Sequence, residues 1–181
     1  MITLRQQQTI AGVVPVEGFG YWSGKDVRVE FRPAPPNTGI VFVRTDLDQP
    51  VRIPATVENR IEIPRRTTLA VGGASVEMVE HVLAALAGLQ IDNCEVWVNR
   101  AEMPGCDGSS EPFVVALTSA GIVPQDWPAR RLIVTDVTFR TEEVLKGAPE
   151  ALKTLTFIGG HVGELRMEMP GSPTFMVGDR G

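Results

Sequence analysis

An acid and an imidazole stand side by side, as Glu80 and His81, in the apolar segment SVEMVEHVLAALAGL. Neutral imidazole is a common zinc ligand. A neighbouring carboxylate can act as general base on metal-bound water, whose pKa falls to roughly 7 on zinc. By itself, however, such a pair more often belongs to an ordinary helix start, where an acid is favoured by the helix dipole. Local sequence therefore leaves both interpretations open.

The element expected to carry this pair is a helix over residues 76–88. Ser75 is the predicted N-cap, Glu77 and Glu80 suit the positive end of the helix, and Gly88 marks its approximate end. Apolar residues recur at helical spacing, which predicts one buried stripe. The members of this stripe are Val79, Val82, Leu83 and Leu86.

Strands are expected before this helix. Val27, Val29 and Phe31 alternate at period two, which predicts a strand with one buried face. The turn-rich segment PAPPNTG then leads into IVFVRTDL, a second strand that we expect to pair antiparallel with the first.

Prolines interrupt the β-rich segment over residues 51–71. Pro54 and Pro64 favour short edge strands with a protruding loop near Arg65 and Arg66. These two arginines match no motif, and a solvated charge pair is their simplest interpretation.

The chain after residue 89 repeats strand, loop and helix. Val96 and Val98 alternate in a strand, MPGCDGS is a loop, and residues 112–120 form a helix that Gly121 closes. Residues 125–131 look like a domain boundary before a new strand in RLIVTDVTFR. Beyond it the pattern is weaker: EEVLKGAPEALKTL has a helical pattern broken by glycine and proline, and GELRMEM is compatible with a strand.

Composition excludes several classes of protein. The 181 residues are 43% apolar and 22% charged, with a net charge of −5. No apolar run approaches the roughly 18 residues of a membrane span, and no basic stripe suits a nucleic acid. The segment MITLRQQQTI lacks the features of a secretory signal. We therefore expect a soluble, cytoplasmic chain with no transmembrane segment and no nucleic-acid partner.

Thiols and imidazoles are scarce. Cys94 and Cys106 form no CxxC pair, so reduced thiols are expected, with metal ligation the less favoured alternative. His81 and His161 are the two histidines of the sequence, which limits every catalytic hypothesis.

Four segments occur in a characteristic order: GFGYWSG, RPAPPNTGIVFVRTDL, VEHVLAALAGLQIDN and MPGCDGSSEPFV. Together they resemble the UDP-3-O-acyl-N-acetylglucosamine deacetylase family, the zinc enzymes of lipid A synthesis, over roughly residues 1–140. The resemblance implies two similar domains, each a β-sheet packed with two helices (ribosomal-protein-S5-domain-2-like), with the metal site between them. We therefore expect an α+β fold, with one complete domain in residues 1–128 and the incomplete or divergent start of a second in residues 129–181.

The resemblance also implies roles for single residues. By motif match, His81 corresponds to the zinc ligand of the first domain. Glu80 corresponds to the general base that activates zinc-bound water for attack on the acetamide of UDP-3-O-acyl-N-acetylglucosamine. Asp107 and Ser109 lie in the matching DGS loop, where substrate contact and helix capping both fit. Trp22 stands where the family commonly has a histidine, so that residue's supporting role is not carried over.

Part of the family's zinc site is missing. The second domain of the family supplies an HxxxD motif that completes the zinc ligands, and a further histidine that acts as acid or stabilises the oxyanion. Neither follows here, because Ala85 is the fourth residue after His81 and Leu165 the fourth after His161. A catalytic zinc needs about three protein ligands plus water, so the expected zinc site is incomplete. An HxxE pair, His161 and Glu164, lies among glycines and suggests an exposed loop rather than a substitute site.

Three interpretations follow from this absence. In the first, the chain is an amino-terminal portion of a deacetylase. In the second, it is half of a split enzyme, completed by a second polypeptide that supplies HxxxD. In the third, it is a non-catalytic module that binds a nucleotide-sugar lipid or a protein. The adjacent Glu80 and His81 favour the first two.

Overall fold

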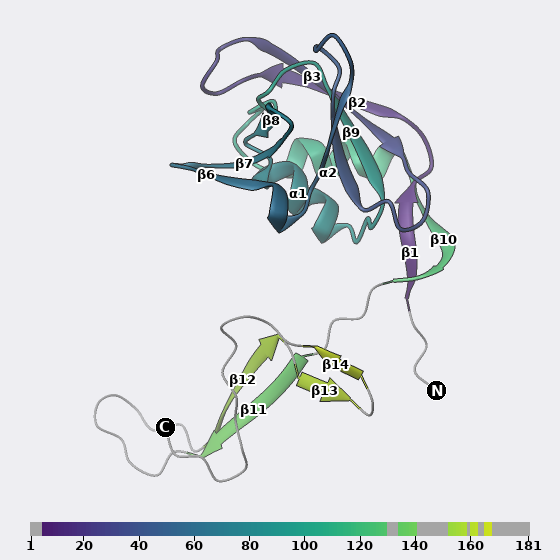
Figure 1. The fold of residues 1–181 in the computed structure, drawn as a ribbon. Helices are drawn as coiled ribbons and strands as arrows, with labels where there is room; N and C mark the ends of the chain where they lie inside the picture. Colours follow the sequence, from purple (N-terminus) through teal and green to yellow (C-terminus); the bar gives the residue numbers. More distant parts are fainter. Residues whose placement is uncertain (1–4, 130–133, 141–151, 159, 163–164, 168–181) are drawn as a thin grey trace. The chain divides into compact units, whose positions relative to one another are not determined.

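The computed structural model describes residues 5–129, 134–140, 152–158, 160–162 and 165–167. The chain divides into two compact units, Met1–Ala129 and Arg130–Gly181 (Figure 1). The assignment of residues 1–128 and 129–181 to two family domains stays a prediction.

A five-stranded sheet forms the centre of the first unit, and its strand order is β2-β3-β9-β4-β5. Its strands are β2 (Val14–Phe19), β3 (Asp26–Pro33), β4 (Ile40–Arg44), β5 (Val51–Pro54) and β9 (Cys94–Val98). All neighbours pair antiparallel except β4 and β9, which are parallel. The predicted alternation is confirmed in β3, where Val27, Val29 and Phe31 are buried.

The predicted antiparallel pairing of the segments now seen as β3 and β4 is wrong. Strand β9 lies between them and pairs with both. Its residues Cys94, Val96 and Val98 are fully buried, so the sheet gains an apolar central strand by separating two strands that are close in sequence.

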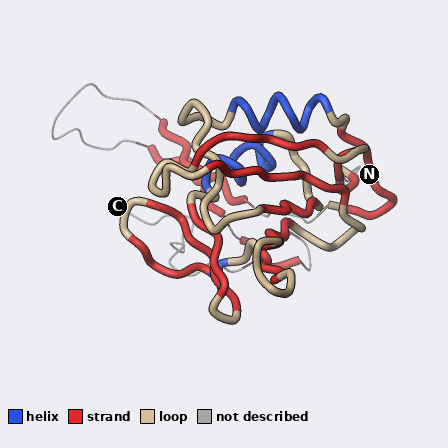
Figure 2. The backbone as a smooth tube through the Cα atoms, turned by 90° about the horizontal axis from the view of Figure 1, so that it is seen from above, coloured by secondary structure: helices blue, strands red, loops and turns tan. Residues whose placement is uncertain are grey.

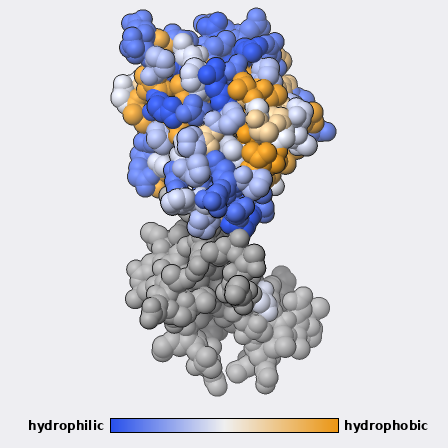
Figure 3. All heavy atoms as spheres, turned by 90° about the vertical axis from the view of Figure 1, so that its right-hand side faces the viewer, coloured by the Kyte–Doolittle hydropathy of each residue, from blue (hydrophilic) through white to orange (hydrophobic). Residues whose placement is uncertain are grey.

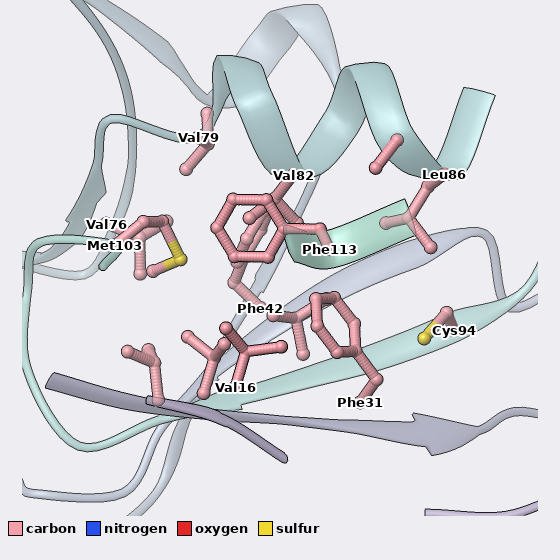
Figure 4. Close-up of a cluster of buried hydrophobic side chains, with 14 of the residues drawn as sticks. Val16, Phe31, Phe42, Val76, Val79, Val82, Leu86, Cys94, Met103 and Phe113 are labelled. Atoms are coloured by element: carbon pink, nitrogen blue, oxygen red, sulfur yellow. The ribbon is translucent and has the colours of Figure 1, made fainter. Parts of the chain in front are cut away.

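Two helices lie in the described part of the first unit: α1 (Glu80–Gly88) and α2 (Glu111–Ser119). From α1 and the residue before it, Val79, Val82 and Leu86 point down towards Phe31 and Phe42 of the sheet (Figure 4). From α2, Phe113 and Leu117 enter the same core, and the Phe113 ring meets Phe31 edge-on with centroids 6.2 Å apart. Leu83 and Val114 are partly buried against this core. The predicted α+β fold with a mostly antiparallel sheet packed with two helices is confirmed, while its finer assignment to the ribosomal-protein-S5-domain-2-like fold stays a prediction.

The helix carrying Glu80 begins later than predicted. Ser75 and Glu77 belong to strand β8 (Ala74–Glu77), so the prediction that they cap and begin the helix is wrong. Gly72 and Gly73 have φ of 58° and 84°, the left-handed geometry of a tight hairpin, and this turn joins β8 to β7 (Arg66–Val71). Burial of Ala74 and Val76 fixes the strand alternation, and the helix starts only after Met78.

Two further small sheets complete the first unit. Strand β6 (Arg60–Ile63) follows the short 3-10 helix η1 (Val57–Asn59) and forms a hairpin with β7, with Arg65 in the turn at a φ of 66°. This confirms the predicted short strands and the loop at Arg65. The prediction is wrong for Arg66, which begins strand β7 in the middle of its sheet and pairs with Glu77 instead of forming a solvated charge pair with Arg65. Strand β1 (Gln6–Ile10) pairs with β10 (Ile122–Pro128). Figure 2 shows the backbone from a second direction, with helices in blue and strands in red.

Strands make up the described part of the second unit. Strand β11 (Val134–Arg140) pairs antiparallel with β12 (Leu152–Ile158), and β13 (Gly160–Val162) with β14 (Leu165–Met167). The predicted strand in RLIVTDVTFR and the one in GELRMEM are confirmed. The helical pattern over 142–155 is wrong at residues 152–155, which are strand, and residues 142–151 lie outside the described residues.

The surface of the first unit mixes both kinds of side chain, and the face drawn in Figure 3 carries apolar patches among hydrophilic residues. Large exposed apolar side chains in the described residues include Phe19, Tyr21, Trp22 and Trp127. Within those same residues, no helix is both long enough and apolar enough to cross a membrane.

Candidate functional site

Glu80 is the first residue of α1 and is partly buried. Its Oε2 accepts a hydrogen bond of 3.2 Å from the backbone N–H of Thr67 on β7, which ties the helix start to the small sheet. Within the described residues its other carboxylate oxygen makes no hydrogen bond. The N-cap, Val79, offers no side-chain hydrogen bond, so Glu80 is the group that meets the positive end of the helix dipole.

The turn before this helix is strained. Met78 has a φ of 60°, an unusual conformation for a residue with a side chain, and a second such residue, Cys106 at 47°, directly precedes Asp107. Both strained residues therefore flank candidate site residues.

His81 is partly buried, and its ring makes no hydrogen bond within the part of the chain that the structure describes. Asp107 lies close enough to feel its charge. The pKa of Asp107 is lowered chiefly by the backbone N–H and hydroxyl of Ser109, and His81 lowers it further. The α1 start and the 106–109 loop therefore influence each other electrostatically, although His81 and Asp107 are 26 positions apart in the sequence.

The Asp107 loop has a structural task in this geometry. The Asp107 Oδ1 atom accepts hydrogen bonds from the N–H and the Oγ–H of Ser109, at 2.9 and 2.8 Å. The Ser109 Oγ in turn accepts from the N–H of Glu111 at 3.1 Å, at the start of α2. The Ser109 hydroxyl therefore accepts the first N–H of α2, although the N-cap residue, Ser110, makes no side-chain hydrogen bond of its own, and Asp107 acts by holding Ser109. Substrate contact by either side chain stays a prediction.

The described residues do not by themselves fit a zinc ion. Among them no three His, Cys, Asp or Glu side chains gather closely enough to hold a metal. His81 is one imidazole, Glu80 is bonded to Thr67, and Asp107 is bonded to Ser109. The remaining histidine, His161, lies in strand β13 rather than in the predicted exposed loop, and Glu164 lies outside the described residues.

The cysteines are free, as predicted. Burial raises the pKa of the Cys94 thiol to about 12, and burial also raises that of Cys106.

A second cluster of charged groups surrounds Arg66, and the sequence pattern did not predict it. Arg66 pairs with Glu77 at 3.0 Å, and its guanidinium lies 5.6 Å from the centre of the Trp22 ring. Buried Glu102 accepts the backbone N–H groups of Trp22 and Ser23, at 2.7 and 2.9 Å. No sequence periodicity links residues 22, 66, 77 and 102, so the sequence pattern could not predict that they cluster. The sequence marked Trp22 only because it stands where the family commonly has a histidine.

The mostly antiparallel sheet packed with two helices defines a protein of the α+β class, with an acid–imidazole pair at the start of one helix. A family model described as "LpxC: UDP-3-O-acyl N-acetylglycosamine deacetylase" matches residues 7–157. Since this is most of the 181 residues, the chain belongs to the LpxC deacetylase family, whose members are zinc-dependent amide hydrolases of lipid A biosynthesis.

Curated relatives agree with this family. The UDP-3-O-acyl-N-acetylglucosamine deacetylase of Hahella chejuensis is 46% identical over 139 residues, which are 76% of this chain and 46% of that protein. The deacetylase of Myxococcus xanthus is 44% identical over 128 residues, or 71% of this chain and 41% of that protein. The bifunctional enzyme LpxC/FabZ of Chlorobaculum tepidum is 44% identical over 133 residues, or 74% of this chain and 28% of that protein. The chain therefore spans less than half the length of these relatives.

Proposed function

We propose that the chain acts as the amino-terminal portion of a UDP-3-O-acyl-N-acetylglucosamine deacetylase, which hydrolyses the N-acetyl amide of its substrate. In this proposal Glu80 is the general base that takes a proton from the attacking water, and His81 is one ligand of the family's zinc ion. The proposal also includes the cytoplasmic location expected from the sequence.

The observation that carries the proposal is the placement of Glu80 and His81 at the start of α1, within electrostatic reach of Asp107. The bond from Thr67 engages one carboxylate oxygen of Glu80, and a carboxylate has acceptor positions left for a water molecule. Val79, Val82 and Leu86 of the apolar stripe behind the helix start are buried and hold α1 in place.

The isolated chain lacks the other zinc ligands of the family, and this limits its zinc affinity and its activity. Because His81 is a single ligand, we expect the isolated chain to bind zinc weakly and to release no acetate from the substrate. We propose that a second domain carrying the HxxxD motif is needed. The length of the relatives is consistent with such a domain in one longer chain, while nothing in the comparisons supports a separate second polypeptide.

The test adds a separately produced second domain of a relative such as the Hahella chejuensis deacetylase and measures acetate release from UDP-3-O-acyl-N-acetylglucosamine. We expect activity in the complex and a loss of about 10²–10⁴-fold with Glu80→Gln, because the amide cannot take the proton. Glu111→Gln is the matched control, since Glu111 is the exposed first residue of the other helix. Its activity should equal that of the wild type.

Metal content separates the two proposed roles. His81→Ala should lower the zinc retained by the complex, whereas Glu80→Gln and the control His161→Ala should not. Equal activity of the wild type and Glu80→Gln in zinc-replete complexes would reject the general-base role. A stable complex that neither retains zinc nor releases acetate would favour the alternative function, a non-catalytic module that binds a nucleotide-sugar lipid or a protein.

A further inference from the structure

A hollow of about 330 Å³ opens where four separate segments of the first unit meet, and we call it the Trp22 hollow. The backbone of Glu77 fixes this meeting point, since its N–H donates to the carbonyl of Ala101 at 2.8 Å and its carbonyl accepts from Met103 at 3.0 Å. Volumes of about 300–1,000 Å³ are typical of small-molecule sites. The residues that line the hollow are Trp22, Ser23, Lys25, Arg66, Glu77, Arg100, Ala101 and Glu102.

The two acids of the Trp22 hollow are already engaged. Glu77 pairs with Arg66 at 3.0 Å. Both carboxylate oxygens of Glu102 accept backbone N–H groups, from Trp22 and Ser23. Burial raises the pKa of Glu102, but these hydrogen bonds and the charge of Arg66 lower it more, so that Glu102 is a carboxylate at neutral pH. Neither acid has to be neutralised by Lys25 or Arg100.

The cations of the Trp22 hollow keep unused donors. Within the described residues the Lys25 ammonium has no hydrogen-bond or ion-pair partner. Arg100 donates its Nε to the carbonyl of Asp26 at 3.3 Å, and its terminal nitrogens have no partner among those residues. It also lowers the pKa of Asp46 slightly, but the two oxygens of that carboxylate are held by Arg44 at 2.8 Å each.

Arg66 adds a third donor group. Its Nε is buried without a hydrogen-bond partner in the part of the chain that the structure describes, which is uncommon for a buried donor. The walls carry three cationic and two acidic side chains, so their formal charge is +1. The cations are Lys25, Arg66 and Arg100, and the acids are Glu77 and Glu102. The ring of Trp22 provides one apolar wall.

We propose that the Trp22 hollow binds a phosphate-class dianion, such as a phosphate monoester or a diphosphate, through Lys25 and Arg100 with Arg66 supporting them. Clustered charged donors with free N–H groups suit the several oxygens of such an anion, because charge-assisted hydrogen bonds are the strong ones. A carboxylate offers fewer oxygens and less charge. This site requires neither hydrolysis nor a second domain, so it stands independently of the proposed deacetylase function.

The experiment titrates the full 181-residue chain with pyrophosphate, inorganic phosphate, UDP and acetate by isothermal titration calorimetry at low ionic strength. We expect pyrophosphate to bind with a dissociation constant of about 1 mM or lower, and acetate to bind more weakly. Lys25→Gln and Arg100→Gln should each weaken pyrophosphate binding about tenfold. Arg60→Gln is the charge-matched control, because Arg60 is exposed on β6 and lines no part of the hollow. It should change affinity by less than about twofold.

A measurement on the wild type keeps the test independent of variant folding. Pyrophosphate should shift the NMR resonance of the Trp22 indole N–H, assigned with Trp22→Phe, and leave that of Trp97, which donates to Glu95 at 2.7 Å. If UDP and pyrophosphate shift the Trp22 resonance similarly, the hollow recognises the diphosphate group that the two ligands share. If the wild type bound UDP but did not bind pyrophosphate, or bound neither anion, the proposal would be overturned. Equal losses of pyrophosphate affinity in Arg100→Gln and Arg60→Gln would also overturn it.

Discussion

Replacing Glu102 by Gln should destabilise the first unit strongly, because this side chain anchors the turn that carries Trp22 and Ser23. Glu102 is 5% exposed, and its two oxygens accept backbone N–H groups at 2.7 and 2.9 Å. Glutamine has nearly the same shape but presents an NH₂ group to one of these donors. One hydrogen bond is then lost and the other becomes neutral.

The magnitude follows from these two bonds. Hydrogen bonds to charged groups contribute about 1.5–3 kcal/mol each, and a neutral one contributes about 1 kcal/mol. Losing two charged bonds and keeping one neutral bond therefore lowers the free energy of unfolding by about 2–5 kcal/mol. The exposed Glu62→Gln on β6 is the matched control and should change it by less than about 0.5 kcal/mol.

Urea denaturation followed by circular dichroism at pH 7 measures this difference, and a pH series tests its cause. The pKa of Glu102 in the folded state is below its usual 4.5, since the hydrogen bonds outweigh the opposing effect of burial. The unfolded chain therefore binds this proton more readily, so the stabilisation is present above pH 4.5 and is lost as the pH falls below it. The gap between wild type and Glu102→Gln should narrow in that range. An equal free energy of unfolding at pH 7, or a gap that persists unchanged at low pH, would refute this reasoning.

Three other predictions concern the same unit. Phe113→Ala should lower the free energy of unfolding by about 3–5 kcal/mol in urea denaturation, because the ring is 1% exposed, whereas Val115→Ala, at a position 61% exposed, should have little effect. The buried Cys94 thiol, with its pKa raised to about 12, should react with a thiol reagent only after urea is added; fast labelling of the native chain at this residue would contradict its burial. Gly20→Ala should lower the melting temperature, because its new Cβ would collide with the carboxylate of Glu102; an unchanged melting temperature would mean that the turn moves freely.

Features governed by local physical chemistry were predictable from the sequence. The alternation of Val27, Val29 and Phe31 predicted β3, because side chains of a strand alternate between two faces. The segment beginning at Pro112 predicted α2, since proline is tolerated in the first turn of a helix. Four short segments in a characteristic order, two of them around Glu80 and Asp107, were together sufficient to predict the family, which the family model confirms over residues 7–157.

The start of α1 required more than local pattern. Ser75 and Glu77 suit a helix start by residue type, yet they lie in β8 because the Gly72–Gly73 turn pairs this segment with β7. The backbone hydrogen bonds of that hairpin, together with burial of Val76, outweigh a weak capping preference.

The sequence by itself therefore determined strands β3 and β9, helix α2, the body of α1, the acid–imidazole pair and the family. Tertiary structure alone decided that β9 separates β3 from β4, that the charge of His81 lowers the pKa of Asp107, and that Lys25, Arg66 and Arg100 share one hollow. The physical reason is that period and propensity act over a few neighbouring residues, whereas strand order and side-chain neighbours are set by how distant apolar faces are buried together.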